Sequence, residues 1–268
     1  MEKVGIMNKV FSKVERIFSK PKLNIVKTIY FNFRTMPLKE AIKLPVFIYG
    51  KVQFPKLSGN VAFQKCKVTR GMVKLGLCVD MFYPKGRSLI ILGDNAQWVF
   101  EGTCFFNTRF TVRITSNASL ILGDNVRVGS NVRILCQQEI RIGTNTDITY
   151  NCEMMDSNFH PILNRTDGSV QQYTKPINIG SSNWIGNNSQ IMKGTKTRDY
   201  TMVSARSLLN RDYVNMYPNG EYVTLAGMPA VLKSSGHQRI FSLEDEDKIR
   251  RFFLNHPGIE FCDLDTLC

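Results

Sequence analysis

Histidine is scarce in this chain, and one of the three histidines lies where a base could act. His160 alone falls inside the patterned central region, and a loop of mixed polarity, residues 161–176, follows it. Imidazole titrates near neutral pH, so it can take a proton from a hydroxyl nucleophile and pass it to a leaving group. Asp156 and Asn158 precede it, and residues two apart share one face of an extended segment. The sequence therefore predicts that these three side chains line one wall. The alternative is a histidine that merely begins a protruding loop.

The region around His160 repeats every six residues. Aliphatic residues recur at this step in three runs, which also include one methionine and one threonine. The runs are Leu122, Val128 and Ile134; Ile142, Ile148 and Met154; and Ile179, Ile185, Ile191, Thr197, Val203 and Leu209. A period of six suits neither an α-helix nor a two-sheet alternation. It is typical of a parallel β-helix, in which each short strand supplies one inward residue and then turns a corner. We therefore expect a mostly β fold, with a parallel β-helix over residues 46–235.

Glycine and asparagine accompany the repeat. Asn125 and Asn131 are six residues apart, and so are Asn145 and Asn151. Corners force the backbone into conformations that exclude bulky side chains, and these two residue types tolerate such conformations best. The shared spacing makes chance periodicity a poor explanation of the pattern.

Helical segments are expected on both sides of the repeat. In residues 1–45, apolar residues recur at three- and four-residue steps between lysines as far as Pro21, which predicts a basic amphipathic helix over residues 1–20. A short second helix, residues 38–44, follows Pro37. In residues 236–268, Ser242 can cap a helix that Pro257 ends. The apolar residues of that last helix, Ile249, Phe252 and Phe253, are expected to face the body.

Positive charge is concentrated at the N-terminus. The net charge is +13, and residues 1–51 hold eleven basic and three acidic side chains, whereas residues 242–268 hold three basic and seven acidic ones. A basic amphipathic helix can make peripheral contact with an anionic membrane through residues 1–20, or it can cap the repeat with its lysines in solvent; we favour the cap. No nucleic-acid partner is expected, because no binding motif or interleaved aromatic platform accompanies the charge.

The composition indicates a globular protein. The 268 residues are 43% hydrophobic and 21% charged, and no apolar stretch reaches the length of about 18 residues that a membrane-spanning helix needs. The N-terminus lacks the uninterrupted apolar core of a secretory signal. Its seven cysteines have no metal-ligand spacing, so we expect small buried residues in a reducing compartment and no metal site. We predict a cytoplasmic protein, with peripheral attachment to the inner face of the membrane as the alternative.

Several strings within the repeat resemble one known family. They are Ile142 to Met154, Met155 to Ile162, Lys175 to Gly180, Asn183 to Asn188, Ile191 to Gly194 and Ala226 to Ala230. In combination they are similar to the hexapeptide-repeat acyltransferases, above all the polysaccharide and sugar O-acetyltransferases. The resemblance implies a left-handed parallel β-helix of hexapeptide repeats, a homotrimer, and acetyl-coenzyme A bound in a groove between subunits. It also implies that His160 is the general base.

The same resemblance assigns residues to the coenzyme A groove. Trp184 and Asn187 match positions that border the groove. Ala205 matches a position whose backbone meets the pantetheine arm, and Arg211 one that carries a basic residue for the nucleotide end. Lys233 is a further candidate for a phosphate contact, on charge and placement alone.

Two departures from the family pattern fall in that groove. Thr197-Arg198 and Ser204 to Ser207 stand where relatives usually carry glycine. Glycine lets the backbone approach a ligand closely, and a longer side chain obstructs that approach. Arg206 therefore either narrows the groove or supplies a phosphate contact.

These observations predict an acetyl-coenzyme A-dependent O-acetyltransferase that acts on a saccharide hydroxyl of a surface-polysaccharide or glycolipid precursor. Two alternatives stay open. One is an N-acyltransferase for a nucleotide-linked amino sugar. The other is a non-catalytic trimeric scaffold whose groove is closed by Arg198, Ser204 and Arg206. A γ-type carbonic anhydrase is set aside, because two of the three histidines lie outside the repeat and too few zinc ligands remain.

Overall fold

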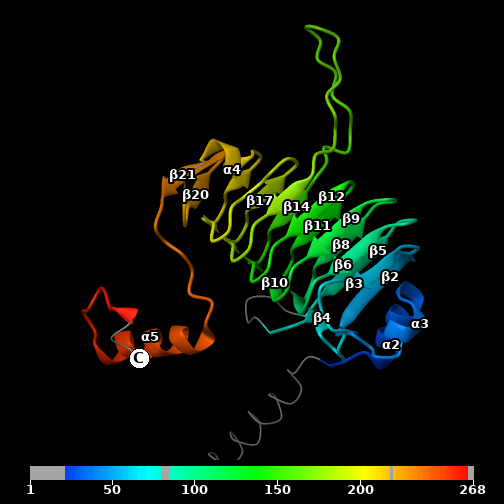
Figure 1. Ribbon diagram of the computed structural model, residues 1–268, viewed down its shortest axis with the longest axis horizontal. Helices are drawn as coiled ribbons and strands as arrows, with labels where there is room; N and C mark the ends of the chain where they lie inside the picture. Colours follow the sequence, from blue (N-terminus) through cyan, green and yellow to red (C-terminus); the bar gives the residue numbers. More distant parts are fainter. Residues whose placement is uncertain (1–21, 80–84, 218–219, 265–268) are drawn as a thin grey trace, which may run out of the picture.

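The structure, a computed structural model, describes residues 22–79, 85–217 and 220–264. Within these ranges the chain winds around three sheets, visiting each in turn (Figure 1). The first sheet contains, in spatial order, β1 (Val46–Ile48), β4 (Val73–Leu77), β7 (Cys104–Asn107), β10 (Val126–Val128), β13 (Asp147–Ile148), β16 (Trp184–Ile185), β18 (Met202–Val203), β20 (Thr224–Gly227) and β21 (Ala230–Ser234).

The other two sheets complete each coil. The second contains β2 (Lys51–Leu57), β5 (Arg87–Leu92), β8 (Thr111–Ile114), β11 (Arg133–Cys136), β14 (Glu153–Met155), β17 (Gln190–Met192) and β19 (Leu208–Leu209). The third contains β3 (Asn60–Phe63), β6 (Gln97–Phe100), β9 (Ser119–Leu122), β12 (Glu139–Ile142) and β15 (Ile177–Ile179). Neighbouring strands are parallel throughout, except for β20 and β21, which are antiparallel.

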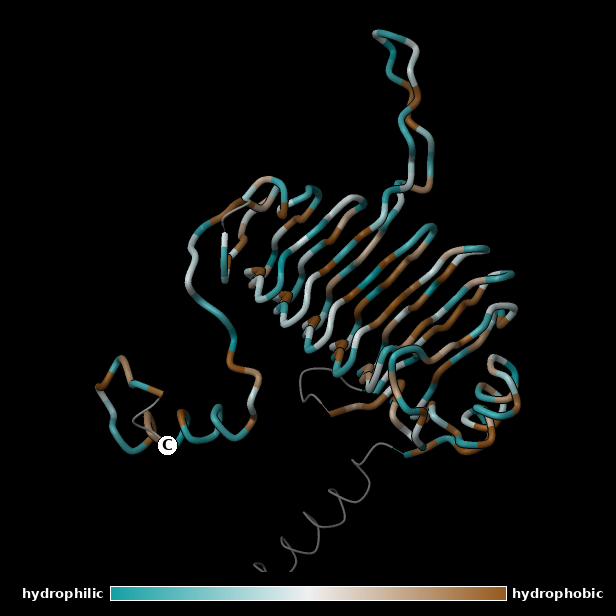
Figure 2. Tube along the Cα trace, viewed as in Figure 1, coloured by the Kyte–Doolittle hydropathy of each residue, from teal (hydrophilic) through white to brown (hydrophobic). Residues whose placement is uncertain are grey.

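The six-residue repeat builds the core. In the second sheet Ile134 pairs with Met154, Met154 with Ile191, and Ile191 with Leu209, and all four side chains are fully buried. Figure 2 shows hydrophobic residues returning at the same place in successive coils. Burial of such a column stabilises each coil only when its neighbour is present. The parallel β-helix predicted from the spacing is confirmed.

Thr197, the one hydroxyl in the last run of the repeat, is satisfied inside the column. Its Oγ1 donates to Asn183 Oδ1 at 2.8 Å and accepts the Gly180 N–H at 3.1 Å. A buried hydroxyl without partners would be costly, but one with two hydrogen bonds is tolerated. The threonine therefore replaces an aliphatic residue without opening the core.

The predicted asparagine corners are confirmed. Asn125, Asn131, Asn145 and Asn151 all have positive φ, between +53° and +60°. Their side chains also bond between coils, since Asn125 Nδ2 donates to Asn145 Oδ1 at 2.9 Å and Asn131 Nδ2 to Asn151 Oδ1 at 2.8 Å. Asparagine thus serves twice, by tolerating the left-handed backbone and by linking the stacked corners.

Two helices cover the N-terminal end of the β-helix, α2 (Ile25–Thr35) and α3 (Leu38–Ala41). The helix α3 is shorter than the one predicted over residues 38–44. The helix α2 meets the open edge of strand β1. Asn32 Nδ2 donates to the Val46 carbonyl at 2.7 Å, and the Val46 and Ile48 N–H groups donate to Asn32 Oδ1 and Thr28 Oγ1. The edge strand is therefore paired by side chains, as a terminal coil requires. The helix expected over residues 1–20 lies outside the described residues.

At the C-terminal end, α4 (Tyr213–Met216) joins the last coils, and α5 (Leu243–Asn255) lies apart from the sheets (Figure 1). The Ser242 side chain accepts the Asp245 N–H, which confirms the predicted cap. The expectation that Ile249, Phe252 and Phe253 pack on the body is wrong, because no residue of α5 is buried. Two of its apolar side chains contact each other, with the Phe252 and Phe253 rings 5.5 Å apart.

Half of the described cysteines depart from the expectation of burial. Cys104, Cys136 and Cys152 are buried, whereas Cys66, Cys78 and Cys262 are partly exposed, and all six are free thiols. Burial raises the pKa of Cys152 to about 11, and it also raises the pKa of Cys104 and Cys136, so these three remain protonated at neutral pH. No helix in the described ranges is long and apolar enough to span a membrane.

Candidate active site

A hairpin interrupts the β-helix between β14 and β15. Elsewhere a few residues turn this corner, but here residues 157–176 leave the prism and project far beyond it (Figure 1). Ser157 pairs with Thr174 at its base, and Leu163 with Val170 nearer its tip, both antiparallel. His160 lies on the outgoing arm, close to the base, and its side chain is exposed.

Asp156 fixes the base of this hairpin. The residue is fully buried, and its carboxylate accepts the Gln137 N–H at 2.7 Å and the Gln138 N–H at 2.8 Å from the previous coil. The Phe159 N–H then donates to Ser157 Oγ at 2.8 Å. A buried carboxylate with two backbone donors is a strong structural anchor. Asp156 therefore positions the hairpin rather than the imidazole.

The predicted wall of Asp156, Asn158 and His160 is wrong. The segment is not extended, because Phe159 adopts a φ of +61°, which breaks the two-residue alternation. Asp156 turns inward, Asn158 is half-buried, and His160 faces solvent. Asn158 instead lines a small cavity between the hairpin and the next coil, together with Ile162, Asn164, Gln171, Tyr173 and Lys193.

Three of the residues expected at the coenzyme A groove lie on two neighbouring coils, and two of them share one corner of the prism. Trp184 is on β16 with its side chain 37% exposed, Asn187 turns the corner after it, and Ala205 turns the same corner one coil later. Gly186 permits the close stacking of these coils, because a Cβ there would lie 2.5 Å from the Ala205 nitrogen. The structure thus brings Trp184, Asn187 and Ala205 together on neighbouring coils.

Arg206 ends the asparagine ladder along this corner. Asn131, Asn151, Asn188 and Arg206 have positive φ values of +58° to +60° on successive coils. The Arg206 N–H donates to the Asn187 carbonyl at 2.9 Å, and its side chain is exposed. The Arg206 side chain is thus in solvent at the corner that also carries Asn187 and Ala205.

The other two basic candidates lie elsewhere on the prism. Arg211 follows β19, at the corner between the second and third sheets, and Lys233 is on β21, at the end of the first sheet. Both are exposed. Within one subunit, therefore, Arg206 lies at the corner between the first and second sheets, Arg211 lies at the next corner, and Lys233 lies on the last strand of the first sheet.

The C-terminal segment covers part of Trp184, which sequence reasoning did not foresee. The Arg239 guanidinium donates to the Asp147 carboxylate, lies 3.5 Å from Glu246, and places its Cζ 5.9 Å from the centre of the Trp184 ring. Asp147 and Trp184 are register partners on β13 and β16. The tail is therefore tied to the same coils that carry the predicted groove.

A second feature missed from sequence is a pair of tyrosines at another corner. Tyr200 and Tyr222 occupy the stacked positions that Asn125, Asn145 and Ser182 hold on earlier coils, with φ values of +59° and +49°. An L-residue in this conformation costs about 1–2 kcal/mol, and a bulky one there is an outlier. The ring centroids lie 5.1 Å apart with the ring planes tilted by 43°, and the two residues remain 41% and 38% exposed. Strain that is retained at an exposed aromatic pair points to a functional surface.

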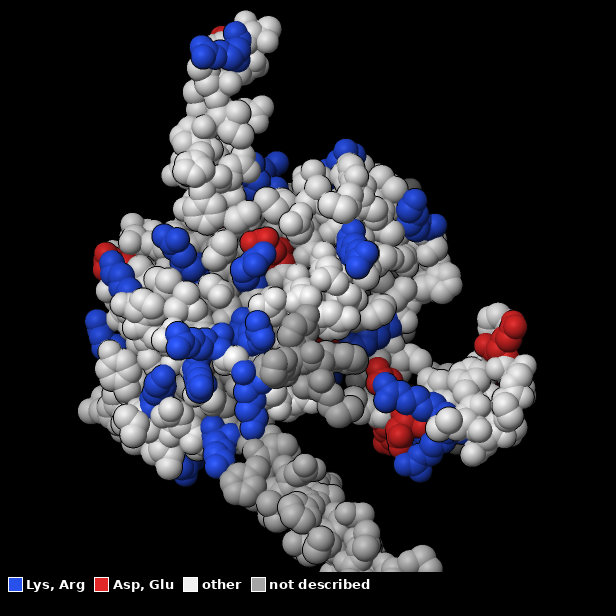
Figure 3. Space-filling view, turned by 180° about the vertical axis from the view of Figure 1, so that it is seen from behind, with Lys and Arg blue, Asp and Glu red and all other residues white. Residues whose placement is uncertain are grey.

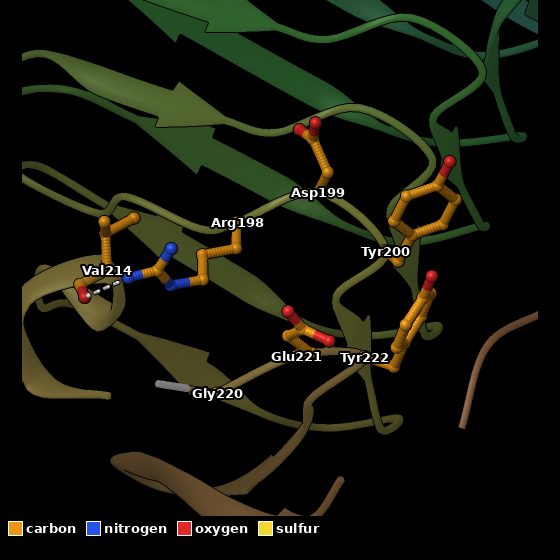
Figure 4. Close-up of a pocket in the computed structure, with 7 residues that line it drawn as sticks. All are labelled: Arg198, Asp199, Tyr200, Val214, Gly220, Glu221 and Tyr222. Atoms are coloured by element: carbon orange, nitrogen blue, oxygen red, sulfur yellow. Dashed lines mark hydrogen bonds between the residues drawn. The ribbon is translucent and has the colours of Figure 1, made fainter. Parts of the chain in front are cut away.

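Figure 4 shows the open cavity beside these tyrosines. Its other lining residues are Arg198, Asp199, Val214, Gly220 and Glu221. Arg198 points away from the rings, and its Nη2 donates to the Val214 carbonyl at 3.3 Å. Arg198 therefore lies at the corner before β18, whereas Asn187 and Ala205 lie at the corner that follows β16 and β18.

The chain has the hexapeptide-repeat, left-handed β-helix fold. No family model matches the sequence, and neither does any curated protein. Among solved structures it is similar to NeuO, a polySia-specific acetyltransferase, with a TM-score of 0.50 and 17% identity over 82% of this chain and 91% of that one. It is also similar to AntD, an N-acyltransferase from Bacillus cereus in complex with dTDP and coenzyme A, with a TM-score of 0.40 and 10% identity over 78% and 88% of the two chains. The polysialic acid O-acetyltransferase OatWY matches with a TM-score of 0.36 and 15% identity over 76% and 95%.

Proposed function

We propose that this protein is an acetyl-coenzyme A-dependent O-acetyltransferase that acts on a saccharide hydroxyl of a surface-polysaccharide or glycolipid precursor in the cytoplasm. The observation that carries the proposal is the position of His160. It is exposed on a hairpin that interrupts a hexapeptide β-helix, and a buried carboxylate holds the base of that hairpin. The fold shared with NeuO, an acetyltransferase, supports the same class of reaction.

In the proposed reaction His160 is the general base. Its neutral imidazole accepts the proton of the acceptor hydroxyl while the hydroxyl oxygen attacks the thioester carbonyl. The tetrahedral intermediate then collapses, the carbon–sulfur bond breaks, and the imidazolium returns its proton to the leaving thiolate. The products are an acetyl ester of the saccharide and free coenzyme A, and the enzyme regains its starting state.

We propose a homotrimer in which the donor lies between two subunits. Arg206 and Arg211 lie at two different corners of one prism, so a single chain does not present both to the same phosphate-bearing group. A neighbouring prism beside the Trp184 corner would complete a groove, with Asn187 and Ala205 on one wall. In the proposed trimer the hairpin of the neighbouring subunit, which projects well beyond the coils, would lie beside this groove (Figure 1).

Acetyl transfer to paired acceptors tests the proposal. Matched hydroxy and amino sugars, supplied with labelled acetyl-coenzyme A, distinguish three outcomes. Label on the hydroxy sugar supports O-transfer. Label mainly on the amino sugar would favour the N-acyltransferase, and no label on either, from a protein that remains folded, would favour the scaffold.

The tyrosine pair supplies a place for the saccharide. An exposed aromatic ring packs against the apolar C–H face of a pyranose, and the neighbouring Asp199 and Glu221 carboxylates can accept hydrogen bonds from hydroxyls. The same two carboxylates disfavour an anionic ligand at this corner, such as the phosphates of coenzyme A. We therefore assign Tyr200 and Tyr222 to the acceptor.

Replacement of both tyrosines by asparagine separates this role from packing. Asparagine is the residue that earlier coils place at the same corner, so Tyr200→Asn with Tyr222→Asn relieves the strained backbone. The acceptor KM should rise by about tenfold or more, because each stacking contact contributes about 0.5–1.5 kcal/mol. The melting temperature should not fall. A lower melting temperature with an unchanged KM would show that the pair serves packing alone, and Tyr30→Ala, on α2, is a control for loss of an exposed tyrosine.

A further inference from the structure

Helix α2 carries its apolar residues on the outside. The solvent-facing side chains are large and hydrophobic, with exposed fractions between 45% and 78%: Ile25, Val26, Ile29, Tyr30 and Phe33. Its buried residues are mostly polar: Thr28, Phe31, Asn32 and Thr35. A surface helix of a globular protein ordinarily has the opposite arrangement.

The edge of the β-helix explains the polar inner face. Strand β1 has no further coil to pair with, so Thr28 and Asn32 supply the hydrogen bonds that another strand would have made. That requirement places hydroxyl and amide groups inward. It does not account for the hydrophobic residues on the outer face, which neither the β-helix nor α3 covers.

Helix α3 extends the same surface. Leu38 is 68% exposed and Ile42 62% exposed. We refer to the exposed apolar residues of α2 together with these two as the α2–α3 face. Exposed apolar surface of this extent on a soluble domain marks an interaction site.

Basic side chains accompany the α2–α3 face. Arg34, Lys39 and Lys43 are exposed, and within the described ranges no acidic side chain lies within ion-pair distance of them. Glu40 is the one acidic residue between residues 22 and 51, which hold six basic ones. Figure 3 shows Lys and Arg gathered over this end of the molecule with few acidic side chains among them. The partner of this face must therefore be apolar and negatively charged at once.

We propose that the α2–α3 face binds the surface of an anionic lipid bilayer. The apolar side chains enter the boundary between headgroups and acyl chains, and the lysines and arginine meet the lipid phosphates. A second copy of the chain would bring the same positive charges to the contact. Residues 1–21 would bring five basic and two acidic side chains, so they lack the complementary charge as well. This inference depends on the exposed face and not on acetyl transfer.

Co-sedimentation of the full-length protein with vesicles tests the proposal. The protein should pellet with mixed phosphatidylglycerol–phosphatidylcholine vesicles and much less with phosphatidylcholine alone. Val26→Asp with Leu38→Asp should lower the partition coefficient by at least tenfold, and the fold should survive because both side chains are largely exposed. Lys39→Gln with Lys43→Gln should lower it by roughly 30-fold on the anionic vesicles.

The matched control is Leu254→Asp, which changes an equally exposed leucine on α5. It should pellet like the unaltered protein. Equal pelleting of the Val26→Asp, Leu38→Asp protein would overturn the proposal, because another segment would then carry the membrane contact. A change in oligomeric state caused by that variant without lipid would also overturn it, since the face would then be an interface between copies.

Discussion

Replacement of His160 by alanine is expected to lower turnover by about 10²- to 10⁴-fold, the usual contribution of a general base. Its side chain is exposed on the hairpin and supports no buried contact, so the melting temperature and the oligomeric state should not change. Steady-state kinetics with a saturating acceptor, together with a thermal melt and light scattering on the same preparation, measure all three quantities.

The other two histidines provide the controls for this variant. His237 and His256 lie beyond the β-helix, both exposed, and their replacement by alanine should leave turnover within about twofold of the unaltered protein. Near-normal turnover in His160→Ala would mean that the hairpin histidine is not the base. A similar loss in all three variants would point to a general effect of the substitutions.

Replacement of Asp156 by alanine is expected to destabilise the protein by about 2–4 kcal/mol. The substitution removes the acceptor of two part-buried N–H groups, those of Gln137 and Gln138. An unsatisfied donor costs about 1–3 kcal/mol when it is fully buried, so we expect the lower part of that range for each of these two. Turnover should fall as well, because the base of the hairpin is no longer held. Asp156→Asn keeps one acceptor oxygen, so its free energy of unfolding should lie between those of Asp156→Ala and the unaltered protein. Chemical denaturation, monitored by circular dichroism, measures the free energy of unfolding.

Asp167→Ala is the matched control, since Asp167 is an exposed carboxylate near the tip of the same hairpin that accepts the Ser169 N–H at 2.8 Å. It should leave the denaturation midpoint unchanged. An Asp156→Ala protein that is as stable as the unaltered one, yet loses turnover as His160→Ala does, would contradict a positioning role. It would restore Asp156 as a direct partner in the reaction.

The β-helix could be predicted from sequence because its rule is local. Each coil must supply an inward aliphatic residue and a corner that tolerates positive φ, so Ile134, Met154 and Asn151 reveal their roles by spacing alone. The cap of α5 is equally local, since Ser242 bonds to a residue three positions away. The packing of α5 could not be predicted in this way, because an apolar face on a helix does not reveal whether the surface of the β-helix is close enough to cover it.

The candidate site was predictable in part. His160 stands out as the one histidine inside the repeat, but alternation suggested a shared wall with Asp156 that a single positive φ at Phe159 removes. The contact between the Tyr200 and Tyr222 rings depends on the number of residues between two corners, and the irregular segment before β20 hides that number. Arg239 reaches Asp147 over 92 positions, and no local pattern signals such a contact.

Calorimetric titration of the purified protein with acetyl-coenzyme A tests the central claim most directly. If Trp184, Asn187, Ala205 and Arg206 border an open groove, binding should be micromolar with one site for each subunit. The oligomeric state is measured on the same sample. No detectable heat of binding in a folded trimer would contradict the account, since an acetyltransferase must bind its donor, and the β-helix would then be a scaffold whose hairpin histidine has no part in catalysis.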